Sequence, residues 1–72
     1  PTLTMRLVII EDEPLVAKDL QNRITRIAPD AQVVATIASV AQARQWFQNN
    51  PPPDLILSDI QLSDGISFDI FE

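Results

Sequence analysis

Three short aliphatic runs, at residues 6–10, 32–37 and 54–59, alternate with two longer segments whose apolar residues recur at helical spacing. The runs are rich in β-branched residues, and such continuous runs are typical of strands that are buried on both faces of a parallel sheet. An order of strand, helix, strand, helix, strand builds right-handed βαβ units. The alternation therefore predicts an α/β fold with a parallel sheet between flanking helices.

The first helix is expected to begin near Pro14, because proline is favoured in the first helical turn, and to end before Pro29. Helical spacing places four apolar side chains on one stripe of this helix: Val16, Leu20, Ile24 and Ile27. Acidic residues at its start would complement the helix dipole. We expect the apolar stripe to pack against the sheet.

The second helix has a clear start and a clear end. Ser39 and Gln42 have the spacing of a capping box, and the prolines at 51–53 stop the helix and form a stiff connector. Its inward side chains are expected to be Val40, Ala43 and Phe47, with Trp46 beside them.

The two ends of the chain carry less information. Residues 1–4 are expected to be a leader or a cloning remnant, with the domain running over 5–72 from Met5. The segment 63–65 is predicted to be a turn in which Gly65 takes a positive φ. Residues 66–72 are expected to start a third helix.

Composition excludes several kinds of chemistry. The 72 residues contain no cysteine and no histidine, which excludes disulfides, histidine bases and the usual zinc ligand sets. Ten acidic against five basic residues give a net charge of −5, so this segment is not expected to bind nucleic acid. Its apolar runs are too short to span a membrane. The absence of cysteine is typical of the cytoplasm, which is the expected location.

Acidic residues follow two of the predicted strands directly. Glu11 and Asp12 end the first strand, and Asp59 ends the third. The carboxyl ends of strands are where open parallel sheets bind ligands, so neighbouring strands would bring three carboxylates together. They could stay ionised together only around a cation, and all-oxygen ligands indicate Mg²⁺, or Mn²⁺ in its place. A carboxylate beside that ion can attack a phosphoryl donor and form an aspartyl phosphate.

Each of these acids also has a simpler interpretation. Glu11 and Asp12 could be acids at a helix start, as Glu13 is expected to be. Asp59 alone could be a turn residue at a strand end, and Asp54 is interpreted as a loop acid. The conjunction of two buried strands that both end in acid favours the shared site.

The segments 7–14 and 54–65 together resemble the first and third strands of response-regulator receiver domains, with the acidic pair, the phosphoacceptor and the loop that follows it. The resemblance covers nearly all of the chain from Met5, and the style of both motifs is similar to receivers of LytTR-type regulators. It implies a flavodoxin-like (CheY-like) topology with strand order 2-1-3-4-5. The chain would hold the first three strands and is expected to be an incomplete receiver.

The resemblance also implies a role for individual residues. Asp59 would be the phosphorylated residue, with a histidine kinase as donor. Asp12 would bind Mg²⁺ directly, Glu11 directly or through water, and Gln61 through its backbone carbonyl. Phosphorylation would switch an output domain beyond residue 72, which in LytTR-type regulators binds DNA. The implied role is that of a signalling receiver and not of an enzyme.

Some receiver features are missing from the sequence. Ser63 stands where the family usually has proline, and no residue matches the switch hydroxyl or the phosphoryl-contacting lysine, since Lys18 lies on the first helix. The strand at 54–59 would then be an exposed edge, through which we expect self-association. A structural or interaction fragment is the main alternative function. An aspartyl-phosphate hydrolase is disfavoured, because Gln61 stands where that class carries a second aspartate.

Overall fold

The computed structural model describes residues 5–58, 61–62 and 65–66 of the chain. Five elements alternate over residues 6–58 and include the three predicted strands and the first two predicted helices. They are β1 (Arg6–Ile10), α1 (Pro14–Ile27), β2 (Gln32–Ile37), α2 (Val40–Asn49) and β3 (Leu55–Ser58). Two short strands follow, β4 (Gln61–Leu62) and β5 (Gly65–Ile66). The α/β alternation read from the sequence is confirmed.

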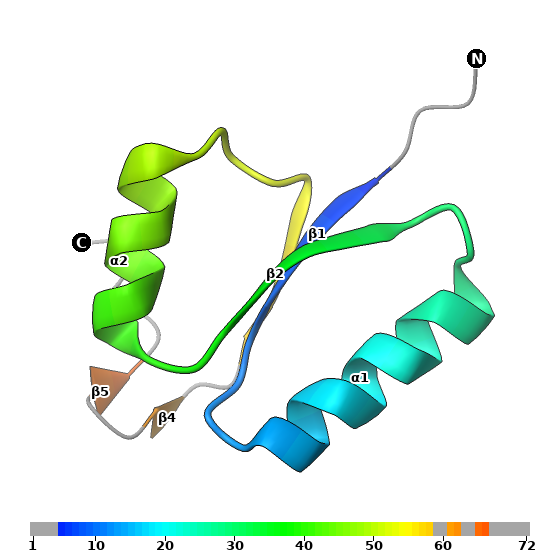
Figure 1. The fold of residues 1–72 in the computed structure, drawn as a ribbon, viewed down its shortest axis with the longest axis horizontal. Coiled ribbons are helices and arrows are strands. Elements are labelled where there is room, and N and C mark those ends of the chain that lie inside the picture. Colours follow the sequence, from blue (N-terminus) through cyan, green and yellow to red (C-terminus); the bar gives the residue numbers. More distant parts are fainter. Residues whose placement is uncertain (1–4, 59–60, 63–64, 67–72) are drawn as a thin grey trace.

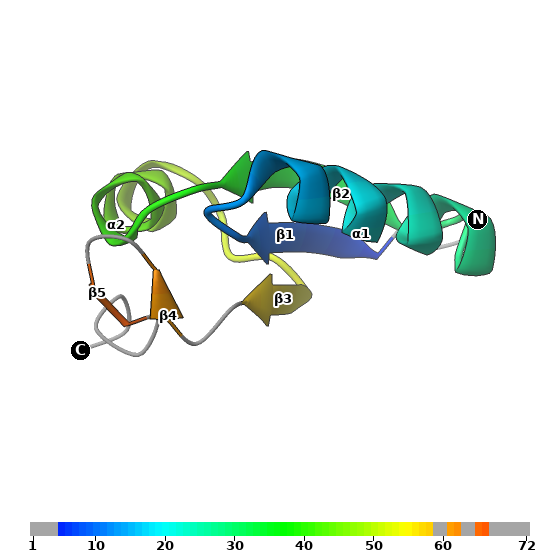
Figure 2. The same cartoon turned by 90° about the horizontal axis from the view of Figure 1, so that it is seen from below.

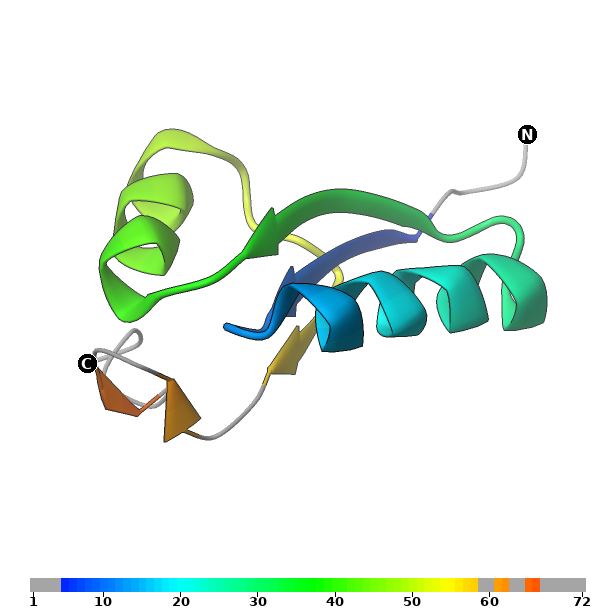
Figure 3. The ribbon, with the colours of Figure 1, turned by 60° about the horizontal axis from the view of Figure 1, so that its bottom comes forward.

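The main sheet has the strand order β2-β1-β3, and both pairings are parallel. In Figure 1 the sheet runs between α1 and α2, and Figure 3 shows β1 between β2 and β3. This arrangement is that of a flavodoxin-like (CheY-like) fold over its first three strands. It places the carboxyl ends of β1 and β3 at the same edge.

The core lies between the sheet and α2. Its buried residues are Val8, Ile10, Ile37, Val40 and Ala43. Partly buried Trp46 and Phe47 pack against this cluster, and their rings meet edge to face with centroids 5.2 Å apart. The inward face predicted for α2 is confirmed.

One β-bulge changes the alternation of β2. Leu7 is opposite Val33 but Val8 is opposite Ala35, so Val34 is an extra residue in the β1–β2 pairing. Val34 and Ala35 consequently both pack against the core on the α2 side. A bulge of this kind puts two successive side chains on one face, where strict alternation would separate them.

Helix α1 starts at Pro14 as predicted, but its apolar stripe is less buried than expected. The buried residue of this helix is Ala17, whereas Val16 is 43% exposed and Ile27 is 81% exposed. Its first turn contains no acid, and Glu13 is the N-cap without a side-chain cap hydrogen bond. The acids at 11–13 therefore precede the helix, with Glu13 at its N-cap.

Helix α2 begins with the predicted cap. The Ser39 hydroxyl accepts a hydrogen bond from the Gln42 N–H at 3.1 Å. The Gln42 side chain reaches back to accept from the Ala38 N–H at 3.2 Å, one residue earlier than in a standard capping box.

Asp54 and the proline segment fasten β3 to β1. The Arg6 N–H donates to Asp54 Oδ2 at 2.8 Å, and the Asp54 N–H donates to the Arg6 carbonyl at 2.9 Å. Arg6 Nη1 also donates to the Pro52 carbonyl at 3.2 Å. Asp54 is thus an anchor between strands, where the sequence suggested only a loop acid.

The segment after β3 differs in part from the expectation. β4 and β5 pair antiparallel, with Gln61 opposite Ile66. Gly65 has a φ of 154°, a positive value as predicted, which suits a residue without a Cβ. Ile66 lies in β5 and does not begin a helix. The remainder of the predicted helix, 67–72, lies outside the described residues.

Candidate functional site

The site expected from the sequence depends on β1 and β3 being neighbours in the same register. The structure pairs them in parallel, with Ile10 opposite Ser58. The carboxyl ends of these two strands therefore lie at the same edge of the sheet. Asp59, the predicted phosphoacceptor, directly follows Ser58 and lies outside the described residues.

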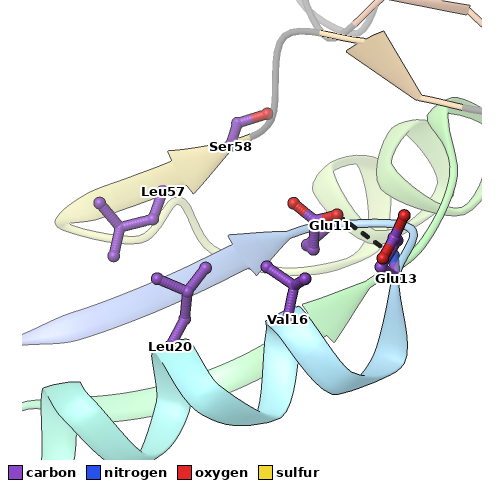
Figure 4. A pocket seen from close by; sticks show the side chains of 6 residues that line it. All are labelled: Glu11, Glu13, Val16, Leu20, Leu57 and Ser58. Atoms are coloured by element: carbon purple, nitrogen blue, oxygen red, sulfur yellow. Dashed lines mark hydrogen bonds between the residues drawn. The ribbon is translucent and has the colours of Figure 1, made fainter.

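Glu11 stands at the centre of this edge. Its backbone N–H donates to the Ile37 carbonyl at 2.9 Å, which continues the β1–β2 pairing by one residue. Its carboxylate oxygen Oε1 accepts from the Glu13 N–H at 3.2 Å, which holds the side chain over the loop before α1 (Figure 4). The carboxylate of Glu11 is thus tied to the loop before α1, and Glu11 lines the same hollow as Ser58 at the end of β3.

Glu11 and Ser58 line one hollow of about 530 Å³ between α1 and β3. Glu13 completes its polar end, and the apolar wall consists of Val16, Leu20 and Leu57. Figure 4 shows Leu20 and Val16 rising from α1 toward the sheet, with Leu57 extending from β3. The hollow is therefore polar at the strand ends and apolar along the helix.

Asp12 lies on the other side of the same loop. It is half-buried and lines a second hollow, together with Lys18 and with Thr36 and Ile37 of β2. Glu11 lines both hollows, so the two predicted metal ligands of this loop share one edge of the sheet. Asp12 does not line the hollow that contains Ser58.

Gln61 is the fourth residue predicted to contact the metal. Its backbone lies in β4, shortly after the Asp59 position. Within the described residues no group of three His, Cys, Asp or Glu side chains is placed to hold a metal ion. The predicted set includes Asp59, so the described part of it consists of two carboxylates and one backbone position.

Sequence reasoning missed two features of this edge. Glu13 was interpreted as an acid at the helix start, yet its side chain also lines the hollow with Glu11. The apolar wall was missed because the strand that contains Leu57 was expected to be buried on both faces of the sheet.

A parallel β2-β1-β3 sheet with an acidic loop after its central strand is the arrangement of response-regulator receiver domains, and comparison with known proteins gives the same class. The chain is 35% identical over 65 residues to the phyllosphere-induced regulator PhyR of Methylorubrum extorquens, covering 90% of this chain and 24% of that protein. It is 35% identical over 68 residues to the sensory transduction protein LytT of Enterococcus faecalis, covering 94% and 27%.

A solved structure agrees with both relatives. The crystal structure of the response regulator PhyR from Brucella abortus superposes with a TM-score of 0.79 at 33% identity, over 96% of this chain and 28% of that one. No family model matches the chain. The chain is thus related to the response regulators and has the fold of their receiver domain over the described residues. It spans about a quarter of the length of the curated relatives that it matches.

The described helices were also compared with what a membrane span requires. Within the described ranges, no helix is both long enough and apolar enough to cross a bilayer.

Proposed function

We propose that the chain is the phosphoacceptor part of a two-component response regulator, with Asp59 as the residue that takes the phosphoryl group. The observation that carries the proposal is the parallel pairing of β1 and β3, in which Ile10 is opposite Ser58. This register puts Glu11 beside the strand that leads into Asp59. The relationship to PhyR and LytT supports the same role.

The residues of this edge suit Mg²⁺, or Mn²⁺ in its place. All the expected ligands are oxygens: the carboxylates of Glu11, Asp12 and Asp59 and the backbone carbonyl of Gln61. Hard divalent cations prefer such ligands, and Mg²⁺ usually takes only one or two carboxylates and keeps several waters. When bound, the ion would supply positive charge that stabilises the phosphoryl group during transfer. The hydrogen bond from the Glu13 N–H keeps Glu11 turned toward this edge.

The proposed chemistry needs a donor from outside the chain. A carboxylate oxygen of Asp59 attacks phosphorus, a P–O bond forms, and the P–N bond of a phosphohistidine breaks with its electron pair going to the imidazole. The chain itself contains no histidine, so the phosphohistidine would belong to a sensor histidine kinase. Small phosphodonors could replace it in the laboratory.

The wider role is proposed from the class of protein. Phosphorylation would shift a conformational equilibrium that controls an output domain, and for a LytTR-type regulator that domain would bind DNA. The module would act as a signalling switch in the cytoplasm and not as an enzyme with turnover. Residues 5–72 would be one part of the receiver.

The test is a Mg²⁺ titration of the chain with and without beryllofluoride, which mimics a phosphoryl group. We expect Mg²⁺ to shift the backbone amide resonances of Glu11, Asp12 and Ser58, and beryllofluoride to shift them further. Asp59→Asn should abolish the second response. Asp30→Asn is the matched control, because Asp30 is an exposed acid after α1, at the opposite end of that helix from the proposed site.

Two outcomes would contradict the proposal. One is a folded sample, judged by its dispersed amide spectrum, in which none of the three resonances responds to Mg²⁺. The other is an Asp59→Asn variant that responds to beryllofluoride as the unmodified chain does. Steady turnover of a phosphate ester would instead indicate a hydrolase.

A further inference from the structure

A hollow of about 410 Å³ lies between the start of α1 and the carboxyl end of β2. The strand order 2-1-3-4-5 of the receiver fold keeps β2 at an edge of the sheet and places further strands beyond β3. In Figure 2, β2 and the start of α1 lie above β1, and β3 lies below it. The hollow therefore lies at the edge of the sheet that further strands of this fold do not cover.

The described residues that line this hollow include two acids and one base. Glu11 and Asp12 precede α1, and both are half-buried. Lys18 lies about one turn after Pro14, at the start of α1, and it is exposed. The other described lining residues carry no charge. Lys18 thus provides a positive charge in a hollow whose other described walls are acidic or neutral.

The helical neighbours of Lys18 do not give it an acidic partner. The positions three and four residues away on either side are Pro14, Leu15, Gln21 and Asn22. Asp19 is next to Lys18 in sequence, but its Oδ2 lies 3.0 Å from Arg23 Nε, and adjacent side chains of a helix do not face each other. Among the described residues, the acids that share a hollow with Lys18 are Glu11 and Asp12.

The position of Asp12 differs from the one that the proposed metal site requires. Asp12 lines the hollow that contains Lys18, and it does not line the hollow that contains Ser58. To bind the same cation as Asp59, which follows Ser58, Asp12 must turn from β2 toward β3. Adjacent carboxylates repel each other and a nearby cation offsets this repulsion, so the charge of Lys18 favours the position beside β2.

We propose that Lys18 is a counter-cation for the acidic pair, which holds Asp12 beside β2 and competes with Mg²⁺ for its carboxylate. The inference rests on the proposed function, since it concerns the same acids and the same ion. Lysine suits this role because its ammonium is a compact charge on a flexible stem, which can approach a carboxylate and withdraw from it. Lys18 is a positioning residue that acts through Asp12.

The consequence is a metal affinity lower than the carboxylates alone would give. Asp12 joins Glu11 and Asp59 around Mg²⁺ only by leaving Lys18, and the ammonium also repels the divalent ion. Both effects weaken Mg²⁺ binding, and both are lost when the charge of Lys18 is removed. A Lys18 variant without this charge is therefore expected to bind Mg²⁺ more tightly.

The first test is a Mg²⁺ titration at low salt, followed by the backbone amide resonances of Glu11 and Asp12. Lys18→Met should lower the Mg²⁺ dissociation constant roughly threefold, and the gain should shrink in about 1 M salt, which screens exposed charges. Lys18→Arg keeps the charge and should stay near the unmodified chain. Arg26→Met is the matched control, because it changes the net charge equally but lies exposed in the last turn of α1.

The second test needs no metal, because the side chain of Lys18 can be observed directly. Lys18 is the single lysine of the sequence, so its Hε resonance is assigned without ambiguity. Asp12→Asn should shift this resonance in the metal-free chain, and Mg²⁺ should shift it in the unmodified chain in the same direction. Asp30→Asn is the control, because Asp30 is an exposed acid in the connection between α1 and β2.

The outcomes separate this inference from the proposed function. Equal Mg²⁺ dissociation constants for Lys18→Met and Arg26→Met would overturn the inference and leave the phosphoacceptor role standing. A Lys18 resonance that responds neither to Asp12→Asn nor to Mg²⁺ would overturn it as well. An Asp59→Asn variant that still responds to beryllofluoride would instead contradict the proposed function alone. Circular dichroism melting checks that each variant is folded.

Discussion

The hydrogen bond between Asp54 and Arg6 gives a sharp test of how β3 is held in register. Asp54→Ala removes the Oδ2 acceptor, which lies 2.8 Å from the Arg6 N–H. The neighbouring hydrogen bond, from the Asp54 N–H to the Arg6 carbonyl, is a backbone contact and remains. The variant therefore removes one of the two hydrogen bonds that join these residues.

The expected cost follows from the chemistry and the exposure of this contact. A hydrogen bond to a charged group contributes roughly 1.5–3 kcal/mol, but water competes at an exposed site, so we take about 1 kcal/mol. Asp54 is exposed. For a chain of this size, about 1 kcal/mol lowers the melting temperature by roughly 4–8 °C. Asp54→Asn keeps an uncharged acceptor and should lose about half as much.

Thermal and urea unfolding, followed by circular dichroism, measure these differences. Asp30→Ala serves as the control, because Asp30 is also an exposed acid and lies in the connection between α1 and β2. The expected order of stability is the unmodified chain and Asp30→Ala, then Asp54→Asn, then Asp54→Ala. If Asp54→Ala has the same unfolding free energy as Asp30→Ala, the reasoning is refuted. Asp54 would then be a loop acid that does not stabilise the strand pairing.

Further variants test the core and the helix cap. Ser39→Ala removes the hydroxyl that caps α2 and should cost about 1 kcal/mol in urea unfolding, and adding Gln42→Ala should cost less than the sum of the two single changes. Ile10→Ala empties a fully buried position and should cost about 2–5 kcal/mol, enough to unfold much of so small a chain. Leu15→Ala, at an exposed position, should stay within about 0.5 kcal/mol; a similar loss at both sites would contradict the assigned core.

Most of the fold could be predicted because the sequence signals for individual helices and strands agree with the elements in the structure. Pro14 marks the start of α1, and Ser39 marks the start of α2, through chemistry that operates within one helical turn. The continuous aliphatic run of β1 predicted burial on both faces, and residues 7–10 are indeed buried. Such signals depend on near neighbours, which a single sequence displays.

The errors concern features that depend on distant residues. Ile27 belongs to the apolar stripe of α1 but is 81% exposed, because helical spacing shows which side chains share a face and not what covers that face. The bulge at Val34 depends on how β2 aligns with β1. Ile66 pairs with Gln61 between β5 and β4, although a helix was expected to start at residue 66. The last two results were decided by strand pairing, which local periodicity does not reveal.

The candidate site was predictable in its location and only partly in its details. Parallel pairing brings Glu11 beside the end of β3, as the strand-end argument requires. The sequence did not predict that Asp12 would line a different hollow from Ser58, next to β2. Adjacent loop residues can point in different directions, and the sequence alone does not show which direction each one takes. The roles of Glu11, Asp12, Asp59 and Gln61 in metal binding and phosphoryl transfer stay predictions.

The central place of β1 has a consequence for synthesis on the ribosome. β1 is synthesised before the other described strands. Its Arg6 can form the hydrogen bond to Asp54 only after a further 48 residues have been synthesised. At about 5–20 residues per second, this wait lasts roughly 2–10 s. Helix α1 can form in well under a millisecond once it emerges, so it can cover one face of β1 long before β3 exists. The most buried strand of the chain is therefore the one that spends longest without its full set of neighbours.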